Sequence, residues 1–289
     1  MFDIFGEIEE WFRSLLTGFI TSNMTTMFTD VNDKTSSIAG EVSKTPQQWN
    51  ASVFSMIQSI SSSVIIPIAS IIIALVMTYE LISMIIEKNN MHDVDTWMIF
   101  RWVFKAFITI TLVSNTFQIT MAIFEVGQSI VNSASAIVGS NSAVNVDEVV
   151  GNLETLLEDM EIGEMLLLTI ESLIMSLAMK IISLLITVVL YVRMMEIYIY
   201  TSVAPIPFST LMNREWGNIG NNYIRGLVAL AFQGFFIMVI VGIYCALVNS
   251  VTVSSDIHSA MFELGAFTVL LCFALFKTSS ISKSIMGAH

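Results

Sequence analysis

The sequence predicts an all-α fold: a polytopic helical membrane protein with about five transmembrane helices. Its 289 residues are 55% hydrophobic and only 12% charged, and their mean hydropathy is +0.77. Soluble domains carry about 25% charged residues, so roughly half of the usual water-facing charge is missing. Several apolar runs of about 17 residues or more match the thickness of a bilayer's hydrocarbon core.

Five segments have the length and composition to cross a bilayer if some tilt is allowed. They are residues 64–86, 106–124, 166–190, 227–248 and 260–276. Each reads as a nearly continuous apolar stretch, so each is expected to form a transmembrane helix.

Lysine and arginine fix the expected orientation of these spans. Eight basic residues fall in three groups, between spans one and two, between spans three and four, and after span five. They are Lys88, Arg101 and Lys105, then Arg193, Arg214 and Arg225, then Lys277 and Lys283. Because basic residues gather on the cytoplasmic side of membrane proteins, we expect the N-terminus outside and the C-terminus in the cytoplasm.

This orientation divides the chain into four parts. They are an external N-terminal tail with an amphipathic helix (1–50), transmembrane helices one and two (51–125), an external acidic loop with an amphipathic helix (126–164), and transmembrane helices three to five (165–289). The helix expected in the tail lies flat on the outer leaflet or against a partner subunit.

Residues 196–212 are apolar enough to be read as a sixth span. Pro205 and Pro207 remove backbone donors there, and exposed backbone of that kind is poorly tolerated in lipid. A sixth span would also place Lys277 and Lys283 outside, against the charge bias. We therefore expect a cytoplasmic extension of span three, followed by a cytoplasmic turn at the two prolines.

The external loop has two halves of different character. Residues 126–143 are rich in Ser, Gly, Asn and Ala, which predicts a flexible or irregular segment. The following stretch, 146–160, carries an apolar stripe at helical spacing with acids on its other face. Its main members are Val146, Val149, Leu153, Leu156 and Leu157. This stripe is expected to dock either on an external partner or on the protein's own transmembrane bundle.

Four polar side chains lie within or near the spans: Glu80, Glu171, Lys180 and Gln233. Ionisable groups at bilayer depth are costly unless they are paired or hydrated. Lys180 lies mid-span, and Glu171 is about 13 Å of helical rise away on the same helix, so it cannot be the partner. A carboxylate from another helix or subunit is required. The four residues are expected to make interhelical or oligomer contacts, or to line a polar passage.

Small residues recur along span four. Gly226, Gly234, Gly242 and Ala246 fall on or near one helical face. Small residues at such spacing let helix backbones approach closely, so we expect them to serve helix packing.

Composition and motifs argue against several functional classes. The net charge of −12 disfavours a nucleic-acid binder that works through phosphate contacts. Cys245 and Cys272 lie in apolar runs, and His92, His258 and His289 are scattered, so no metal-ligand spacing is present. No phosphate-binding loop or catalytic triad pattern occurs either. We expect no catalytic site, no cofactor and no metal.

Two blocks of sequence resemble a known family. They are VRMMEIYIYTSVAPIPFSTL (192–211) and YIRGLVALAFQGFFI (223–237). With an external tail, five spans and a large loop after span two, the chain resembles the TrbL-type polytopic inner-membrane channel subunit of type IV secretion systems. The form it resembles is that of Gram-positive conjugative elements, and the likeness runs from about residue 54 onward.

The resemblance implies a structural channel or scaffold subunit in the cytoplasmic membrane that helps to pass DNA and protein from donor to recipient. Its implied partners are further copies of itself, other type IV secretion membrane subunits and ATPases, with DNA touched only transiently. Two alternatives remain open at this point. One is a stand-alone transporter or ion channel that uses Glu171 and Lys180, and the other is an assembly factor without a pore.

Overall fold

The computed structural model describes residues 4–87, 96–139, 146–251 and 257–288, and every regular element within them is a helix. The helices divide between two compact units. Unit 1 comprises Met1–Val42, Asn132–Leu190 and Phe236–Lys277, and unit 2 comprises Ser43–Val131, Tyr191–Phe235 and Thr278–His289. Because the units are formed from interleaved segments, four long helices, α6, α8, α10 and α11, contribute to both.

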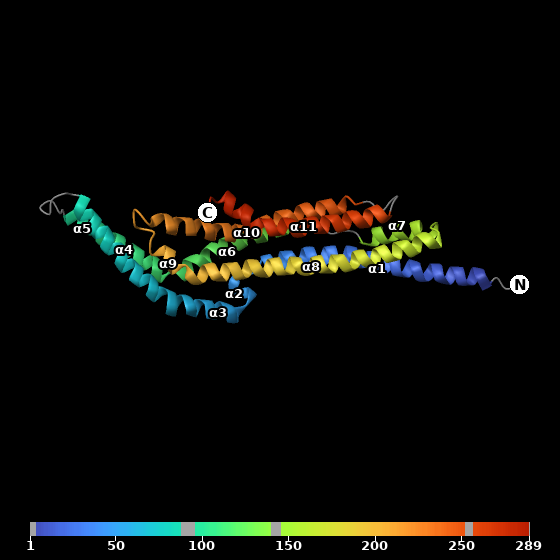
Figure 1. Cartoon of the computed structure of the whole chain (residues 1–289), viewed down its shortest axis with the longest axis horizontal. Coiled ribbons are helices and arrows are strands. Elements are labelled where there is room, and N and C mark those ends of the chain that lie inside the picture. The colour runs from blue at the N-terminus through green and yellow to red at the C-terminus, as the bar shows by residue number, and fades with distance from the viewer. Residues whose placement is uncertain (1–3, 88–95, 140–145, 252–256, 289) are drawn as a thin grey trace. The chain divides into compact units, whose positions relative to one another are not determined.

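Figure 1 labels most of the helices, whose bounds are as follows. They are α1 (Ile4–Val42), α2 (Pro46–Trp49), α3 (Ala51–Ile60), the π-helical turn η1 (Ser61–Ile65), α4 (Ile66–Glu87), α5 (Thr96–Ser114), α6 (Thr116–Gly139), α7 (Val146–Glu158), α8 (Ile162–Val203), α9 (Pro205–Phe208), α10 (Gly217–Asn249) and α11 (Ile257–Ile285). Six stretches are long and apolar enough to cross a membrane, namely Ala51–Ile86, α5, α6, α8, α10 and α11.

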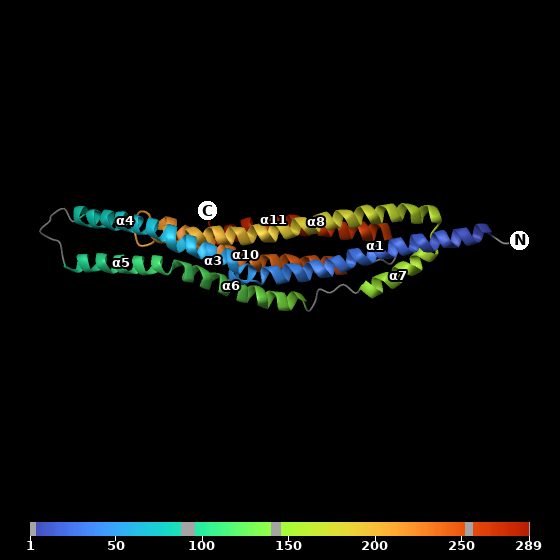
Figure 2. The same ribbon diagram turned by 90° about the horizontal axis from the view of Figure 1, so that it is seen from below.

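The N-terminal segment of unit 1 is one continuous helix rather than a tail with a short helix. Buried apolar residues recur along α1 at helical spacing, including Leu16, Ile20, Met24, Met27 and Val31. This stripe packs into unit 1, which explains why the helix continues through a polar stretch of low mean hydropathy. In both views α1 runs alongside α8 (Figures 1 and 2).

Two hydrogen bonds set the register of α1 against α8. The Asn23 amide donates to Ser172 Oγ at 3.0 Å, and the Lys34 ammonium donates to the Ser183 carbonyl oxygen at 3.2 Å. Each pair is separated by 149 positions in the chain. The two helices therefore run parallel, and a residue of α1 lies level with the residue 149 positions later on α8.

Unit 2 is built around a mixed aliphatic and aromatic core. Tyr198, Phe208, Met77 and Leu230 are buried there with eight further side chains. The Tyr198 hydroxyl donates to the Pro46 carbonyl oxygen at 2.6 Å and so ties the short α2 segment to α8. A buried hydroxyl needs such a partner, so this bond helps to define how α2 packs.

Prolines account for the irregular backbone of unit 2. The π-helical turn η1 ends directly before Ile66-Pro67, and Pro67 has no amide to donate to the preceding turn. Pro205 and Pro207 likewise fall in α9, the single turn that follows the end of α8 at Val203. Residues 196–203 thus extend the helix that contains span three, as the sequence predicted.

The second predicted span differs most from expectation. A single residue, Asn115, separates α5 from α6. Hydrogen bonds from Asn115 N to Thr111 O (3.2 Å) and from Ile119 N to Asn115 O (3.0 Å) carry the helical pattern across the junction. The chain therefore does not reverse there. Because α5 and α6 continue in the same direction, together they count as one crossing. The six candidate stretches are therefore consistent with the five predicted spans.

The expectation of an irregular segment at 126–143 is wrong up to Gly139, where α6 ends. Thr120, Phe124, Gly127 and Val131 form a buried stripe along α6 at helical spacing. Small polar residues weaken helices in water, but a packed stripe outweighs this preference. The last four residues of the predicted segment, 140–143, lie outside the described residues.

Candidate functional site

Glu80 makes a largely buried ionic contact in unit 2. Its side chain is 5% exposed, and it accepts from the Lys105 ammonium of α5 at 2.7 Å and from the Asn213 amide at 2.9 Å. Lys105 is 26% exposed, so the pair reaches water on one side. Both carboxylate oxygens are thereby satisfied, which is the condition for holding a charge at low exposure.

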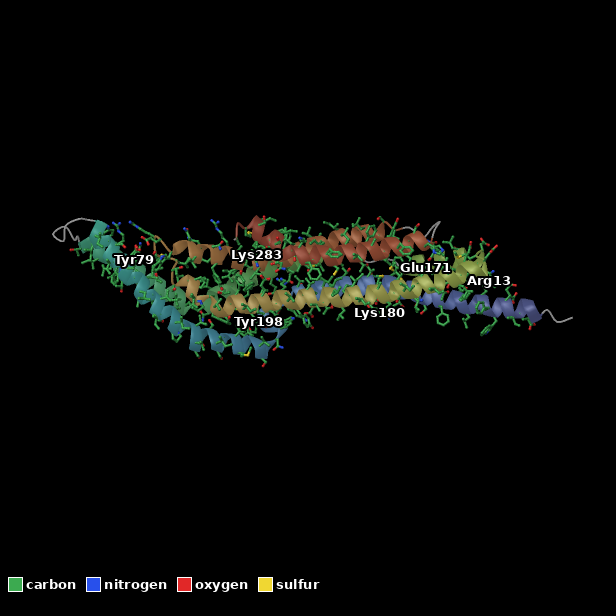
Figure 3. All side chains as sticks on the ribbon, viewed as in Figure 1. Arg13, Tyr79, Glu171, Lys180, Tyr198 and Lys283 are labelled. Atoms are coloured by element: carbon green, nitrogen blue, oxygen red, sulfur yellow. The ribbon has the colours of Figure 1, made fainter. Side chains whose placement is uncertain are left out.

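The Glu80 contact also positions the segment between α9 and α10. Asn213 Oδ1 accepts from the backbone amides of Glu215 and Trp216, each at 2.9 Å. The Tyr79 hydroxyl donates to the Glu215 carboxylate at 3.0 Å, and the Tyr79 ring stacks on Trp216. Tyr79 is labelled in Figure 3 on α4. The arrangement fixes the loop between α9 and α10 against α4.

Glu171 pairs with a histidine in unit 1. Its Oε2 lies 2.5 Å from Nδ1 of His258 at the start of α11, and both side chains are partly exposed, at 26% and 33%. The pairing joins α8 to α11. Glu171 therefore has a partner from another helix, as a carboxylate in a spanning helix requires.

Lys180 lies on the exposed face of α8, apart from Glu171 (Figure 3). Its neighbours on that face are Leu173, Leu177 and Leu184, which are 62–65% exposed. Among the residues that the structure describes, Lys180 makes no hydrogen bond or ion pair. The structure therefore does not bring Lys180 and Glu171 together into one polar passage.

Gln233 lies in the interior of unit 2. Its Nε2 donates to Thr278 Oγ1 at 3.1 Å, and the side chain is 3% exposed. Its Oε1 has no partner within the described part of the chain. Nearby on α11, the Lys283 ammonium donates to the Glu196 carboxylate of α8 at 2.6 Å. These contacts join α8, α10 and α11.

The four small residues of α10 do not form one packing face. A side chain at Gly226 would meet the Tyr200 ring at 3.3 Å in unit 2, and one at Gly242 would meet Val138 at 3.2 Å in unit 1. Gly234 is buried, whereas Ala246 is exposed. A close approach between α6 and α10 that was not predicted involves Gly127: a Cβ there would lie 2.8 Å from the Ala231 carbonyl oxygen.

The stripe on α7 is largely covered by the chain itself. Leu153 and Leu157 are buried in unit 1, Leu156 and Val146 are partly buried, and the side chain of Val149 lies outside the described residues. These side chains pack against their own chain, so we do not retain the stripe as an exposed docking surface for a partner.

Arg13 of α1 holds the end of α7 in place. Its guanidinium donates to the carbonyl oxygens of Leu157 (3.4 Å), Glu158 (3.2 Å) and Met160 (2.7 Å). The last carbonyls of a helix lack internal partners, and a cation at this end is favourable. The sequence offered no signal for this contact, because 144 to 147 positions separate the partners.

A groove with a largely apolar lining lies in unit 2. This groove of about 440 Å³ opens between α4 and α5, faced by Ile73, Met77, Trp102 and Ile110, and no lining side chain is titratable. No three His, Cys, Asp or Glu side chains gather as a metal site within the described ranges. The polar contacts found here connect helices to one another.

The chain matches a described protein family. The sequence model of a family described as TrbL/VirB6 plasmid conjugal transfer like protein matches residues 31–205, more than half of the chain. No curated protein and no solved structure matches. The match spans α1 from Val31 through the end of α8, so it includes Glu80, Lys105 and Glu171, whereas Asn213 and His258 lie beyond it.

Proposed function

This chain belongs to the TrbL/VirB6 plasmid conjugal transfer family, and on that premise we propose that it is a structural channel or scaffold subunit of a conjugative type IV secretion system. Membership makes it a multi-pass component of the cell membrane. The finer proposal is that copies of the chain assemble in the membrane and help DNA and protein to cross it.

The family match over residues 31–205 is the observation that carries this proposal. One structural observation supports the scaffold role: three charged residues connect helices to one another. Glu80, Glu171 and Lys283 each contact a side chain of another helix. Such contacts suit a scaffold, because they define how long helices pack without presenting reactive groups.

We further propose that other type IV secretion subunits and ATPases are its partners, that DNA is contacted only transiently, and that the source is a Gram-positive conjugative element. The acidic balance of the chain supports weak contact with DNA, because phosphate binding needs basic surface. A stand-alone transporter using Glu171 and Lys180 has less support, since Glu171 pairs with His258 and Lys180 lies on the outer face of α8.

A conjugation assay tests the proposal. Deleting this gene from its conjugative element should abolish transfer, and supplying the full chain in trans should restore it. Cross-linking in the membrane should give a ladder of homo-oligomers. Transfer at the normal frequency from the deletion strain would refute the role, and solute flux through the protein alone in liposomes would favour the transporter instead.

A further inference from the structure

Two exposed stripes in unit 1 share a spacing but differ in chemistry. The first is on α8, where consecutive members are alternately four and three positions apart. It consists of Leu166, Ile170, Leu173, Leu177, Lys180 and Leu184. Its apolar members are 41–65% exposed. Alternating steps of four and three are the spacing of a coiled-coil seam, and a single polar residue in such a seam specifies register.

The second stripe is on the polar side of α1 and follows the same alternation. It consists of Ser22, Thr26, Thr29, Asp33, Ser36 and Gly40, all exposed except the partly exposed Thr26. Every member except Asp33 is small and uncharged. Small residues leave space for large ones and let a neighbouring helix approach closely. The α8 stripe thus offers large side chains with one cation, and the α1 stripe offers small side chains with one anion.

The two charges lie at nearly the same level. Because α1 and α8 run parallel with an offset of 149 positions, Lys180 is level with Val31. Asp33 is two residues further along α1, which is about 3 Å of helical rise. In the described part of the chain, neither Lys180 nor Asp33 makes a hydrogen bond or ion pair. Asp30, one turn before Lys34, lies near the Lys34 ammonium instead.

Exposing the polar members of these stripes to lipid would be unfavourable. The α8 stripe belongs to a candidate spanning helix of high hydropathy, so Lys180 would face hydrocarbon without a counter-charge. The α1 stripe lies beside the same part of α8 and carries hydroxyls and a carboxylate outward. One surface of suitable shape and charge would cover both stripes.

We propose that this surface is a second copy of the chain. The α8 stripe of one protomer packs on the α1 stripe of its neighbour, and Lys180 pairs with Asp33 of the neighbouring protomer. Copies in one membrane share an orientation, so their symmetry axis runs along the membrane normal. Rotation about that axis does not change the height of any residue along the membrane normal. Lys180 and Asp33 are at nearly the same height within one protomer, so they are also at nearly the same height in neighbouring protomers. This inference rests on the proposed homo-oligomer and assigns its contact surface.

Cysteine cross-linking tests the contact in the full-length protein. Two tagged forms are co-expressed in a background with Cys245→Ala and Cys272→Ala, one carrying Leu177→Cys and the other Thr29→Cys. An oxidant should give a disulfide-linked heterodimer, because Leu177 is level with Phe28, the residue directly before Thr29. The control replaces Thr29→Cys by Gly18→Cys, which is also exposed but lies about 15 Å along the helix axis from the level of Leu177. This control pair should give no cross-link. Each chain carries one cysteine, so a link within one chain is impossible.

Charge exchange tests the ion pair itself. Lys180→Asp and Asp33→Lys should each weaken the oligomer roughly tenfold or more, since like charges then meet at a covered site. The variant that combines both changes should form the oligomer again, because opposite charges then meet with their positions exchanged. Lys180→Asp combined with Asp30→Lys is the matched control and should not restore it.

The outcomes separate this inference from the function on which it rests. A normal oligomer that gives no heterodimer and tolerates both single charge changes would overturn the contact and leave the channel proposal standing. If Asp30→Lys, and not Asp33→Lys, restored the oligomer of the Lys180→Asp variant, the proposed contact would also be overturned, because Lys180 would then pair with Asp30. A chain that stays monomeric in the membrane while conjugation proceeds would refute the homo-oligomer as well.

Discussion

Unit 1 and unit 2 differ most in their charge. Unit 1 contains seventeen acidic and four basic residues, whereas unit 2 contains seven acidic and eight basic ones. Two thirds of the lysine and arginine therefore lie in unit 2. Because basic residues collect on the cytoplasmic side of membrane proteins, this difference supports a cytoplasmic position for the connecting segments of unit 2 and an external one for those of unit 1.

The two units also differ in how their interiors are filled. Unit 2 uses aromatic pairs such as Trp49–Tyr198 and Tyr200–Tyr223. Unit 1 buries mainly aliphatic and methionine side chains, among them Met24, Met27 and Met165. Aromatic pairs have specific geometry, whereas methionine adapts to irregular gaps. We infer that packing in unit 2 is the more specific of the two.

The largest expected effect concerns the two sides of the membrane. Asn152→Cys in unit 1, an exposed position on α7 within the predicted external loop, should react fully with an impermeant thiol reagent on intact cells. Ser284→Cys in unit 2 should react only after permeabilisation. Ser284 is exposed, whereas the neighbouring Ser282 is buried and donates to Ala229 O, so Ser284 is the suitable probe. Labelling of Ser284→Cys on intact cells would contradict the orientation.

Next in size is a change to the covered stripe of α7. Leu153→Asp with Leu157→Asp should place two charges where both side chains are now buried. We expect more than about 4 kcal/mol of destabilisation in unit 1, because buried charges without partners are strongly unfavourable. Limited proteolysis of the purified protein should then cut near α7. The exposed pair Glu154→Gln with Glu158→Gln is the control and should leave the digestion pattern unchanged.

The corresponding test of unit 2 removes its buried carboxylate. Glu80→Ala leaves Lys105 and Asn213 without their partner, so we expect a loss of about 2–3 kcal/mol. This is below the usual cost of breaking a buried ion pair, because Lys105 is 26% exposed. Thermal unfolding in detergent measures the loss. Glu80→Gln keeps an acceptor for Asn213 and should cost less; equal losses would mean that the charge is unimportant.

The smallest effect is expected at Arg13. Arg13→Ala removes the donor to three carbonyl oxygens at the end of α7. Hydrogen bonds to a partly exposed cation contribute about 1–2 kcal/mol, so amide hydrogen exchange in α7 should accelerate while unit 2 is unchanged. Arg13→Lys retains a single cationic donor and should give an intermediate rate. Faster exchange in both units would show that they are not independently stable.

Most of the helices were predictable from hydropathy because their signals are local. An apolar run of sufficient length predicts a spanning helix whatever its neighbours are. Four of the five predicted spans fall within continuous helical stretches, and the second is divided between α5 and α6 at Asn115. The extension of α8 to Val203 follows from the prolines behind it. The region after Phe124 was mispredicted because its composition is typical of loops, while the buried stripe that stabilises α6 is recognised only once its packing partners are known.

Partners of polar residues were much less predictable. The sequence identified Glu80, Glu171 and Lys180 as groups that must be paired or hydrated at bilayer depth, since that requirement depends on each residue's own position in a span. It could not identify Lys105, His258 or Asn213 as neighbours, because those positions are distant in the chain. The same holds for the close approach of Gly127 to Ala231.

The sequence by itself therefore determined the membrane character of this protein, its helical class, the expected orientation and the likeness to a conjugal transfer family. These properties depend on composition and on patterns within single segments. Only the tertiary structure decided that α1 runs level with α8, that α7 is covered by its own chain, and that Lys180 lies on an exposed face. Those features depend on which helices pack together, and helix packing is set by contacts between residues far apart in the sequence.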